Sequence, residues 1–220
     1  MTVDQQRDIT APLVALTFDD GPSVWTEPIL DHLARHDGHA TLFVLGCVVD
    51  GREGTLRRLV SDGHEIGNHT YSHPGDLAEQ SDAQIRDELD RTTALIEDAA
   101  GVTPMHWRTP FLRSSPRLIS VAGRLGLRHV DCSIMPGDWA ASGEETFRRA
   151  RDSLQHGAVI VLHDGRPPDE PAQLSFPTRE ETVRAVELLL DHMSERGMRC
   201  VTVAELSAAD DQNSSLGPLG

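Results

Sequence analysis

Two short motifs supply side chains that commonly bind metal ions. Asp19 and Asp20 are adjacent in TFDDGP at 17–22, and His69 and His73 lie four residues apart in HTYSH. Histidines at this spacing can share one face of a helical turn, as paired metal ligands do. A carboxylate with two histidines is a hydrolytic zinc set and also the facial triad of non-haem iron, so the metal stays open. Each motif alone also has a structural explanation, since Asp-Asp-Gly-Pro is common in turns and the chain has 11 histidines.

Three further polar residues follow apolar segments. Arg108 precedes a proline in RTPF, Asp138 precedes a tryptophan, and His163 ends AVIVLH. An arginine can hold a carboxylate through its planar guanidinium group, and a histidine can exchange a proton near neutral pH. Each of the three has a plain structural explanation when taken alone. Their occurrence together with the two motifs above favours a hydrolytic site.

The composition excludes several other classes of function. The 220 residues carry a formal net charge of −15, from 20 basic and 35 acidic residues, which opposes binding to nucleic acid or anionic membranes. Every basic residue is arginine, so Walker-type phosphate loops and Schiff-base chemistry, which need lysine, are excluded. Cys47, Cys132 and Cys200 are widely spaced in apolar segments, and we interpret them as buried hydrophobic residues.

The chain carries no apparent targeting or membrane segment. No apolar run approaches the roughly 20 residues that a membrane helix needs, so we expect no membrane partner. The first residues, MTVDQQRDIT, are polar and do not resemble a secretory signal. We therefore expect a cytoplasmic protein, or a secreted one if a leader has been removed.

The reactive residues follow short segments that have the length and composition of strands. These segments are rich in Val, Ile and Thr and alternate with longer amphipathic ones. Strands are expected at 12–19, 39–46, 64–69, 105–109, 127–134, 158–163 and 198–203. Helices are expected at about 24–36, 52–62, 81–99, 115–125, 143–156 and 178–196. Ser81 is a candidate N-cap, and Thr178 with Glu181 matches the capping-box pattern.

Alternating strands and helices predict an α/β fold, either a barrel or a doubly wound sheet. Both architectures place their chemistry at the C-terminal ends of parallel strands. We expect a polar extension at 1–11, one catalytic domain at 12–206 and a disordered, Gly- and Ser-rich tail at 207–220. The strand ends carry the candidate residues Asp19, Asp20, His69, Arg108 and His163, and the fifth strand runs toward Asp138.

The five motifs together resemble those of the polysaccharide deacetylase family, carbohydrate esterase family 4. They are TFDDGP, HTYSHP, RTPF, Asp-Trp at 138–139 and VLH at 161–163, in this order. The likeness is especially close in GHEIGNHTYSHP at 63–74 and spans about 12–206. The resemblance implies a distorted, incomplete (β/α) barrel of seven or eight units, with its active site at the C-terminal ends of the strands.

The resemblance also implies a role for each motif residue. Asp20, His69 and His73 would bind one divalent metal, with zinc expected and cobalt, nickel, manganese or iron as alternatives. Asp19 would act as the base that activates water, held and tuned by Arg108. His163 would act as the acid, oriented or tuned by Asp138. Phe111 would offer its backbone N–H to the oxyanion, and Trp139 and Val161 would line the acetyl pocket.

Three features depart from the family pattern or add to it. Val161 stands where the family usually has leucine, which enlarges the acyl pocket slightly. The Pro-rich stretch 165–177 is a candidate lid or wall over the site. Tyr71, the only tyrosine of the chain, lies between the paired histidines, so we expect it to contact the substrate.

The leading hypothesis is hydrolysis of an N-acetyl group on an amino sugar or its oligomer. The nearest alternative is deacylation of a small N-acyl metabolite by the same residues. An iron enzyme that activates oxygen is a second class, but it leaves Asp19, Arg108 and His163 without roles. A binding module without activity is a third, although it would be expected to lack one of the reactive residues. The oligomeric state stays open.

Overall fold

A parallel sheet of seven strands organises the part of the chain that the computed structural model describes, residues 11–168, 170 and 176–215. The strands are β1 (Leu13–Gly21), β2 (Thr41–Val44), β3 (Glu65–Asn68), β4 (His106–Trp107), β5 (Arg128–His129), β6 (Ala158–His163) and β7 (Arg199–Cys200). Their order is β5-β4-β3-β2-β1-β6, with β7 also paired to β1. An isolated parallel bridge between Ile134 and Ile160 connects the chain after β5 to β6. The sheet is therefore a curled, incomplete barrel, and the predicted fold class is confirmed.

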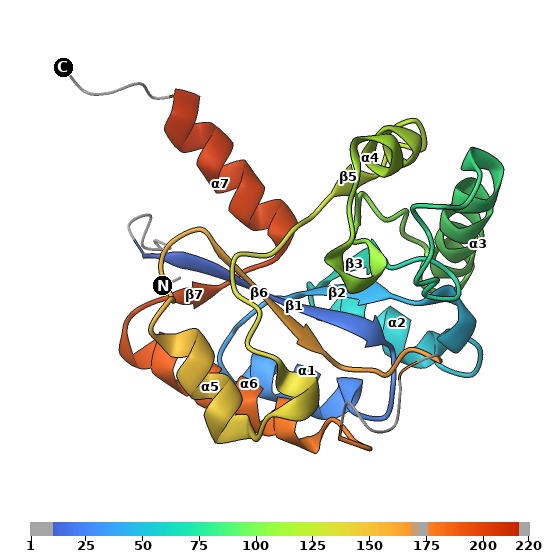
Figure 1. The fold of residues 1–220 in the computed structure, drawn as a ribbon. Helices are drawn as coiled ribbons and strands as arrows, with labels where there is room; N and C mark the ends of the chain where they lie inside the picture. The colour runs from blue at the N-terminus through green and yellow to red at the C-terminus, as the bar shows by residue number, and fades with distance from the viewer. Residues whose placement is uncertain (1–10, 169, 171–175, 216–220) are drawn as a thin grey trace.

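Among the described residues, six α-helices lie between the strands, as the sequence predicts, and a seventh, which was not predicted, follows β7. They are α1 (Thr26–Arg35), α2 (Glu53–Ser61), α3 (Asp82–Ala100), α4 (Pro116–Gly123), α5 (Gly143–Arg151), α6 (Glu180–Glu195) and α7 (Val203–Ser215). Figure 1 shows α1, α5 and α6 along one side of the sheet, and α7 projecting away from it. Among the described helices, none is long and apolar enough to cross a membrane.

Alternate side chains of β1 point to opposite faces of the sheet, one toward the hydrophobic core and the other toward the candidate site. Val14, Leu16 and Phe18 belong to the large apolar cluster between the sheet and the helices. Because successive side chains of a strand point to opposite faces, Thr17 and Asp19 face the inside of the barrel. Every residue of β1 except the first is buried, as expected for a central parallel strand covered on both faces.

The pairing of β1 with β6 brings the two ends of the site together. Asp19 lies directly opposite His163 in the parallel register of these strands. The two residues are 144 positions apart in the sequence. The register therefore places a candidate base beside a candidate acid at the same rim.

The tail predicted to be disordered from residue 207 is helical as far as Ser215, so that prediction is wrong for these residues. Thr202 and Glu205 form a reciprocal cap: the Glu205 N–H donates to Thr202 Oγ1, and the Thr202 N–H donates to Glu205 Oε2. Val203 and Leu206 are buried, which fixes the first turn. Residues 216–220 and 1–10, which carry the rest of the expected tail and most of the extension, lie outside the described residues.

One of the two expected helix caps is correct. Ser81 accepts a hydrogen bond from the Gln84 N–H and forms a capping box with it. The capping box of Thr178 with Glu181 is wrong, since α6 begins after Arg179 without a side-chain cap. The Glu181 carboxylate instead accepts a hydrogen bond of 2.6 Å from the Gly143 N–H at the start of α5. The Glu181 side chain therefore caps the start of α5 and not the start of its own helix, α6.

Candidate metal centre and active site

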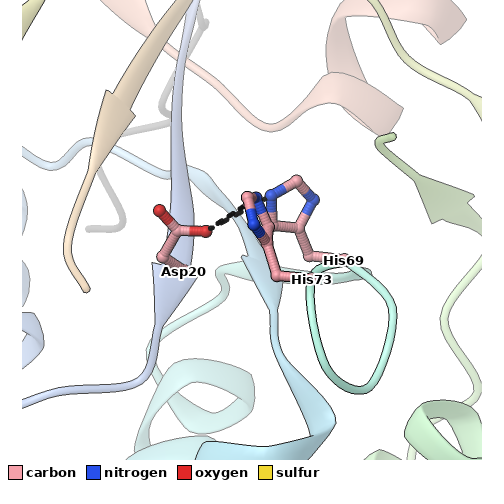
Figure 2. A group of neighbouring side chains, drawn as sticks. All are labelled: Asp20, His69 and His73. Carbon is pink, nitrogen blue, oxygen red and sulfur yellow. Dashed lines mark ion pairs between the residues drawn. The ribbon is translucent and has the colours of Figure 1, made fainter. Parts of the chain in front are cut away.

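Asp20, His69 and His73 are buried and point toward one another (Figure 2). The Oδ1 atom of Asp20 lies 3.4 Å from Nε2 of His69 and 3.5 Å from Nε2 of His73. Donor atoms bound to one ion in a tetrahedron, at bonds of about 2.1 Å, lie about 3.4 Å apart. One carboxylate and two imidazole donors at these separations fit a single divalent metal ion.

The end of β1 turns two adjacent carboxylates toward the same site. The pairing of β1 with β2 shifts register between Asp19 and Gly21, and Asp20 has a left-handed φ of 73°. This irregularity redirects a side chain that strict alternation would point away. The N–H groups of Asp164 and Gly165 donate to the Asp19 carbonyl and hold the turn. A Cβ atom at Gly21 would lie 2.0 Å from Asp164 Oδ2, so this position requires glycine.

The histidine pair lies in a loop after β3 and not on a helical turn, so the expected helical geometry is wrong. Thr70 has a φ of 73° and His73 a φ of 58°. The Thr70 N–H donates to Asn68 Oδ1, and the His73 N–H donates to Thr70 Oγ1. These left-handed residues curl the loop, so both imidazoles reach the same point. The two imidazoles therefore lie close together, as the spacing suggests, but a left-handed loop and not a helical turn brings them there.

His69 is fixed by a backbone carbonyl. Its Nδ1 atom lies 3.0 Å from the Arg108 carbonyl oxygen, which can only accept a hydrogen bond. Nδ1 therefore carries the proton, and Nε2 is left with a lone pair directed at Asp20 and His73. Such outer partners are the usual way in which proteins orient a ligating imidazole.

Arg108 is fully buried and holds Asp19. Its Nη1 atom donates to Asp19 Oδ1 at 2.9 Å and to Thr17 Oγ1 at 2.7 Å, and its guanidinium lies over the Phe43 ring. The other oxygen of Asp19, Oδ2, lies 3.8 Å from His69 Nε2. One carboxylate oxygen is thus anchored, while the other faces the candidate metal centre.

His163 is paired with a buried carboxylate. Its Nδ1 lies 2.9 Å from Asp138 Oδ1, and its backbone N–H donates to Asp138 Oδ2, which also accepts from Thr182 Oγ1. Burial by itself lowers the pKa of His163, but the charge and hydrogen bond of Asp138, with Asp20 and Asp19 nearby, raise it to about 9. The imidazole is therefore protonated at neutral pH and suited to donate a proton from Nε2.

A cavity of about 370 Å³ joins these groups. Its walls include most of the residues expected at the site, and Phe111 is 51% exposed at its rim with a left-handed φ of 54°. Four of the lining residues, Leu112, Met135, Pro167 and Glu170, are not among the candidate residues named from the sequence. The lining consists of Asp19, Asp20, His69, His73, Phe111, Leu112, Met135, Trp139, Val161, His163, Pro167 and Glu170.

The missed residues differ in how far the sequence signalled them. Pro167 and Glu170 belong to the Pro-rich stretch at 165–177, which was expected to form a lid or wall, although residues 169 and 171–175 of it lie outside the described residues. Leu112 directly follows RTPF. Met135 lies between the fifth strand and Asp138, and no chemical feature of its side chain marks it.

Tyr71 does not line the cavity, so the expectation that it contacts the substrate there is not supported. Its ring lies under the guanidinium of Arg91 on α3, 3.6 Å from Arg91 Cζ to the ring centroid. The residue packs the histidine loop against α3. Although Tyr71 lies between the two candidate ligands in the sequence, its side chain packs against α3 and not into the cavity.

Comparisons with known proteins agree with this geometry. A family model described as polysaccharide deacetylase matches residues 6–130. The chain is 35% identical over 197 residues to a chitooligosaccharide deacetylase from Bradyrhizobium sp. (strain ANU 289), covering 88% of this chain and 90% of that protein.

Two solved structures are also similar. Peptidoglycan deacetylase PdaC from Bacillus subtilis has a TM-score of 0.83 and 28% identity, covering 95% of this chain and 96% of that chain. A family 4 acetyl xylan esterase from Clostridium thermocellum, in complex with a cobalt ion, has a TM-score of 0.77 and 35% identity. The alignment covers 89% of this chain and 90% of that esterase.

Proposed function

This chain belongs to the polysaccharide deacetylase family, carbohydrate esterase family 4, and we propose that it removes acetyl groups from N-acetylated amino-sugar oligomers. It is a metal-dependent hydrolase of the carbon–nitrogen bond. The observation that carries the proposal is the position of the Asp20, His69 and His73 donors beside Asp19 and in the same cavity as His163.

Asp20, His69 and His73 would hold the metal ion. When bound, a divalent ion lowers the pKa of a water molecule from about 15.7 to about 7 and polarises the substrate carbonyl. Zinc is the metal we propose, because its preferred donors are these nitrogen and oxygen atoms. The cobalt ion in the related esterase supports a site that accepts other divalent metals.

The protein groups would move two protons during hydrolysis. Asp19, anchored through Oδ1 by Arg108, takes a proton from the attacking water at Oδ2. His163 gives its Nε2 proton to the departing nitrogen, because an amine leaves only when protonated. The carbon–nitrogen bond breaks, and acetate and a free amine result. The Phe111 backbone N–H is proposed as a donor to the oxyanion, and Trp139 and Val161 as walls of the acetyl pocket.

Substrate length separates this proposal from deacylation of a small N-acyl metabolite. We expect kcat/KM to rise along a series of N-acetylglucosamine oligomers and to exceed the value for simple N-acyl amines, with acetate release followed by mass spectrometry. A rate independent of the number of sugar units would reject the oligomer substrate and favour the small-molecule alternative.

The similarity to an acetyl xylan esterase supports a second candidate activity, removal of O-linked acetyl groups. An alkoxide leaves more readily than an unprotonated nitrogen, which would have to leave as an amide anion, so ester cleavage depends less on an acid. We therefore expect His163→Ala to lower the rate on N-acetyl substrates more than the rate on acetylated xylan. Equal losses on both substrates would mean that His163 has no specific role in protonating nitrogen.

A further inference from the structure

The loop that carries the two histidine ligands has a backbone that needs support from outside. Thr70 and His73 both have positive φ, and neither is glycine. Side chains with a Cβ atom adopt this conformation at a cost, and such residues persist where the surrounding structure holds them. The Thr70 N–H and hydroxyl bond within the loop and its strand, and the Gly46 and Cys47 N–H groups donate to the Thr70 and Tyr71 carbonyl oxygens. These bonds leave the N–H groups of Tyr71 and Ser72, which lie between Thr70 and the second ligand, to be fixed from elsewhere.

Glu88 on α3 supplies that support. Its Oε2 atom accepts hydrogen bonds from the Tyr71 N–H at 2.9 Å and the Ser72 N–H at 2.8 Å. Its Oε1 atom accepts a third, of 2.8 Å, from the Ser72 hydroxyl. The half-buried carboxylate thus binds consecutive N–H groups in the short stretch between His69 and His73. Hydrogen bonds to an ionised acceptor are stronger than those between neutral groups.

Other contacts from α3 hold the two flanks of the loop. Asn68 Nδ2 donates to the Leu89 carbonyl oxygen at 2.8 Å, and Arg91 lies over the Tyr71 ring. These contacts fix the end of β3 and a side chain behind the loop. Glu88 differs from them because it binds the backbone between the ligands, and so it acts on the separation of the two imidazoles.

We propose that Glu88 is a positioning residue of the metal centre, whose carboxylate locks residues 71–72 so that His69 and His73 present their Nε2 atoms together. The inference rests on the metal-dependent function proposed above. A loop fixed before the ion arrives loses little conformational freedom on binding, so metal affinity rises. A flexible loop would lose conformational entropy when the ion binds, and metal affinity would be lower.

Metal affinity of the whole chain tests the proposal without any substrate. Zn²⁺ and Co²⁺ dissociation constants are measured by competition with a chromophoric chelator. We expect Glu88→Ala to weaken binding by roughly 10- to 100-fold, the usual effect of losing an outer partner of a metal ligand. Asp90→Ala is the matched control, because Asp90 is an exposed carboxylate of the same helix. Its affinity should equal that of the parent chain.

A conservative variant distinguishes hydrogen bonding from charge. The amide oxygen of Glu88→Gln can still accept from both backbone N–H groups, and its NH₂ group can donate to the Ser72 hydroxyl. We expect its metal affinity to stay within a few-fold of the parent value. Affinity as low as that of Glu88→Ala would overturn the anchoring role and assign the effect to charge alone.

A purely structural role predicts a different result. It would lower the melting temperature of metal-free Glu88→Ala while leaving its metal dissociation constant unchanged, and that outcome contradicts the proposal. If Glu88→Ala does not fold, Ser72→Ala, which loses one of the three bonds, should bind metal a few-fold more weakly. Unchanged affinity in that variant would then reject the inference.

The proposed function can fail separately. If the variants change metal affinity as expected but no N-acetylated sugar is hydrolysed, the positioning role stands and the substrate assignment falls. If the function is correct, excess metal should restore the turnover of Glu88→Ala. Turnover that stays low at saturating metal would place Glu88 in the chemistry itself and overturn the proposal.

Discussion

Asp19 and Asp20 are chemically identical neighbours that the backbone gives different surroundings. Asp20 faces two imidazoles, whereas Asp19 is bound by a buried guanidinium. Without a metal ion, burial raises the pKa of Asp20, but a hydrogen bond from His69 and the charges of His163, His69 and His73 in their protonated forms hold it below its usual value. The Asp20 carboxylate is therefore ionised and ready to bind a cation.

This difference predicts separable losses when each carboxylate is changed. Asp19→Asn should retain bound metal, measured by elemental analysis, but lose roughly 10²-fold or more in kcat, the scale of a missing general base. Asp20→Ala should lose both the metal and the activity. Retained turnover in Asp19→Asn would exclude Asp19 as the base.

The His163–Asp138 pair predicts a shift in the pH profile. Because the pKa of His163 is raised to about 9, the acid form is lost only as pH rises through that value, and kcat should fall on that alkaline side. Asp138→Asn removes the main charge that raises this pKa. The alkaline limb of kcat should therefore move to lower pH. Circular dichroism across the same pH range serves as the folding control, and an unmoved limb would separate Asp138 from the acid.

At the scale of elements, helix α7 depends on a local signal that composition concealed. Its residues beyond 206 are small and polar, which is why the sequence suggested disorder. The first turn is nevertheless capped by Thr202 and Glu205, and its Val203 N–H donates to Thr41 Oγ1 on β2. A helix start that is both capped and docked can extend through residues with little apolar surface.

Because the Thr202 hydroxyl caps α7, the stability of this helix depends on that group. Thr202→Ala should destabilise the chain by about 1 kcal/mol, the usual effect of losing an N-cap, measured by urea unfolding. Ser207→Ala, an exposed position one turn further along, should have no such effect. Equal stability of the two variants would show that the buried first turn needs no cap.

In the molecule as a whole, a metal ion held by Asp20, His69 and His73 would join β1 to the loop after β3. A ligand that binds only the folded chain raises the free energy of unfolding by about 4.1 kcal/mol when its concentration is 1,000-fold above its Kd. For a chain of this size, each kcal/mol raises the melting temperature by roughly 2–4 °C. Removing metal with a chelator should therefore lower the melting temperature by about 8–16 °C. His73→Ala should show no metal-dependent change, and a metal-dependent shift in that variant would exclude His73 as a ligand.

The sequence predicts the order and type of elements well because they follow hydrophobic periodicity. All seven strands and the six expected helices are present near their expected positions. The shortest strands, β4, β5 and β7, were expected to be longer, because apolar residues continue past the few that pair. Boundaries depend on partners that the chain meets only after folding.

The candidate site was predictable as a set of residues and less so as a geometry. The motif residues lie at strand ends, and the rule for parallel sheets is sufficient to bring them together. The bulge at Asp20 and the left-handed Thr70 and His73 have no simple sequence signal, since none is glycine. Glu88 also carries no signal, because its partners are backbone groups on a distant loop.

The alignment of Asp19 with His163 has a consequence for biosynthesis. All three metal ligands lie before residue 74, whereas the opposing acid belongs to a strand completed 90 residues after His73. A ribosome would therefore release the cation-binding half of the centre well before its proton donor. Until β6 pairs with β1, the nascent polypeptide has candidate ligands for an ion but no complete catalyst, and hydrolysis awaits the synthesis of β6.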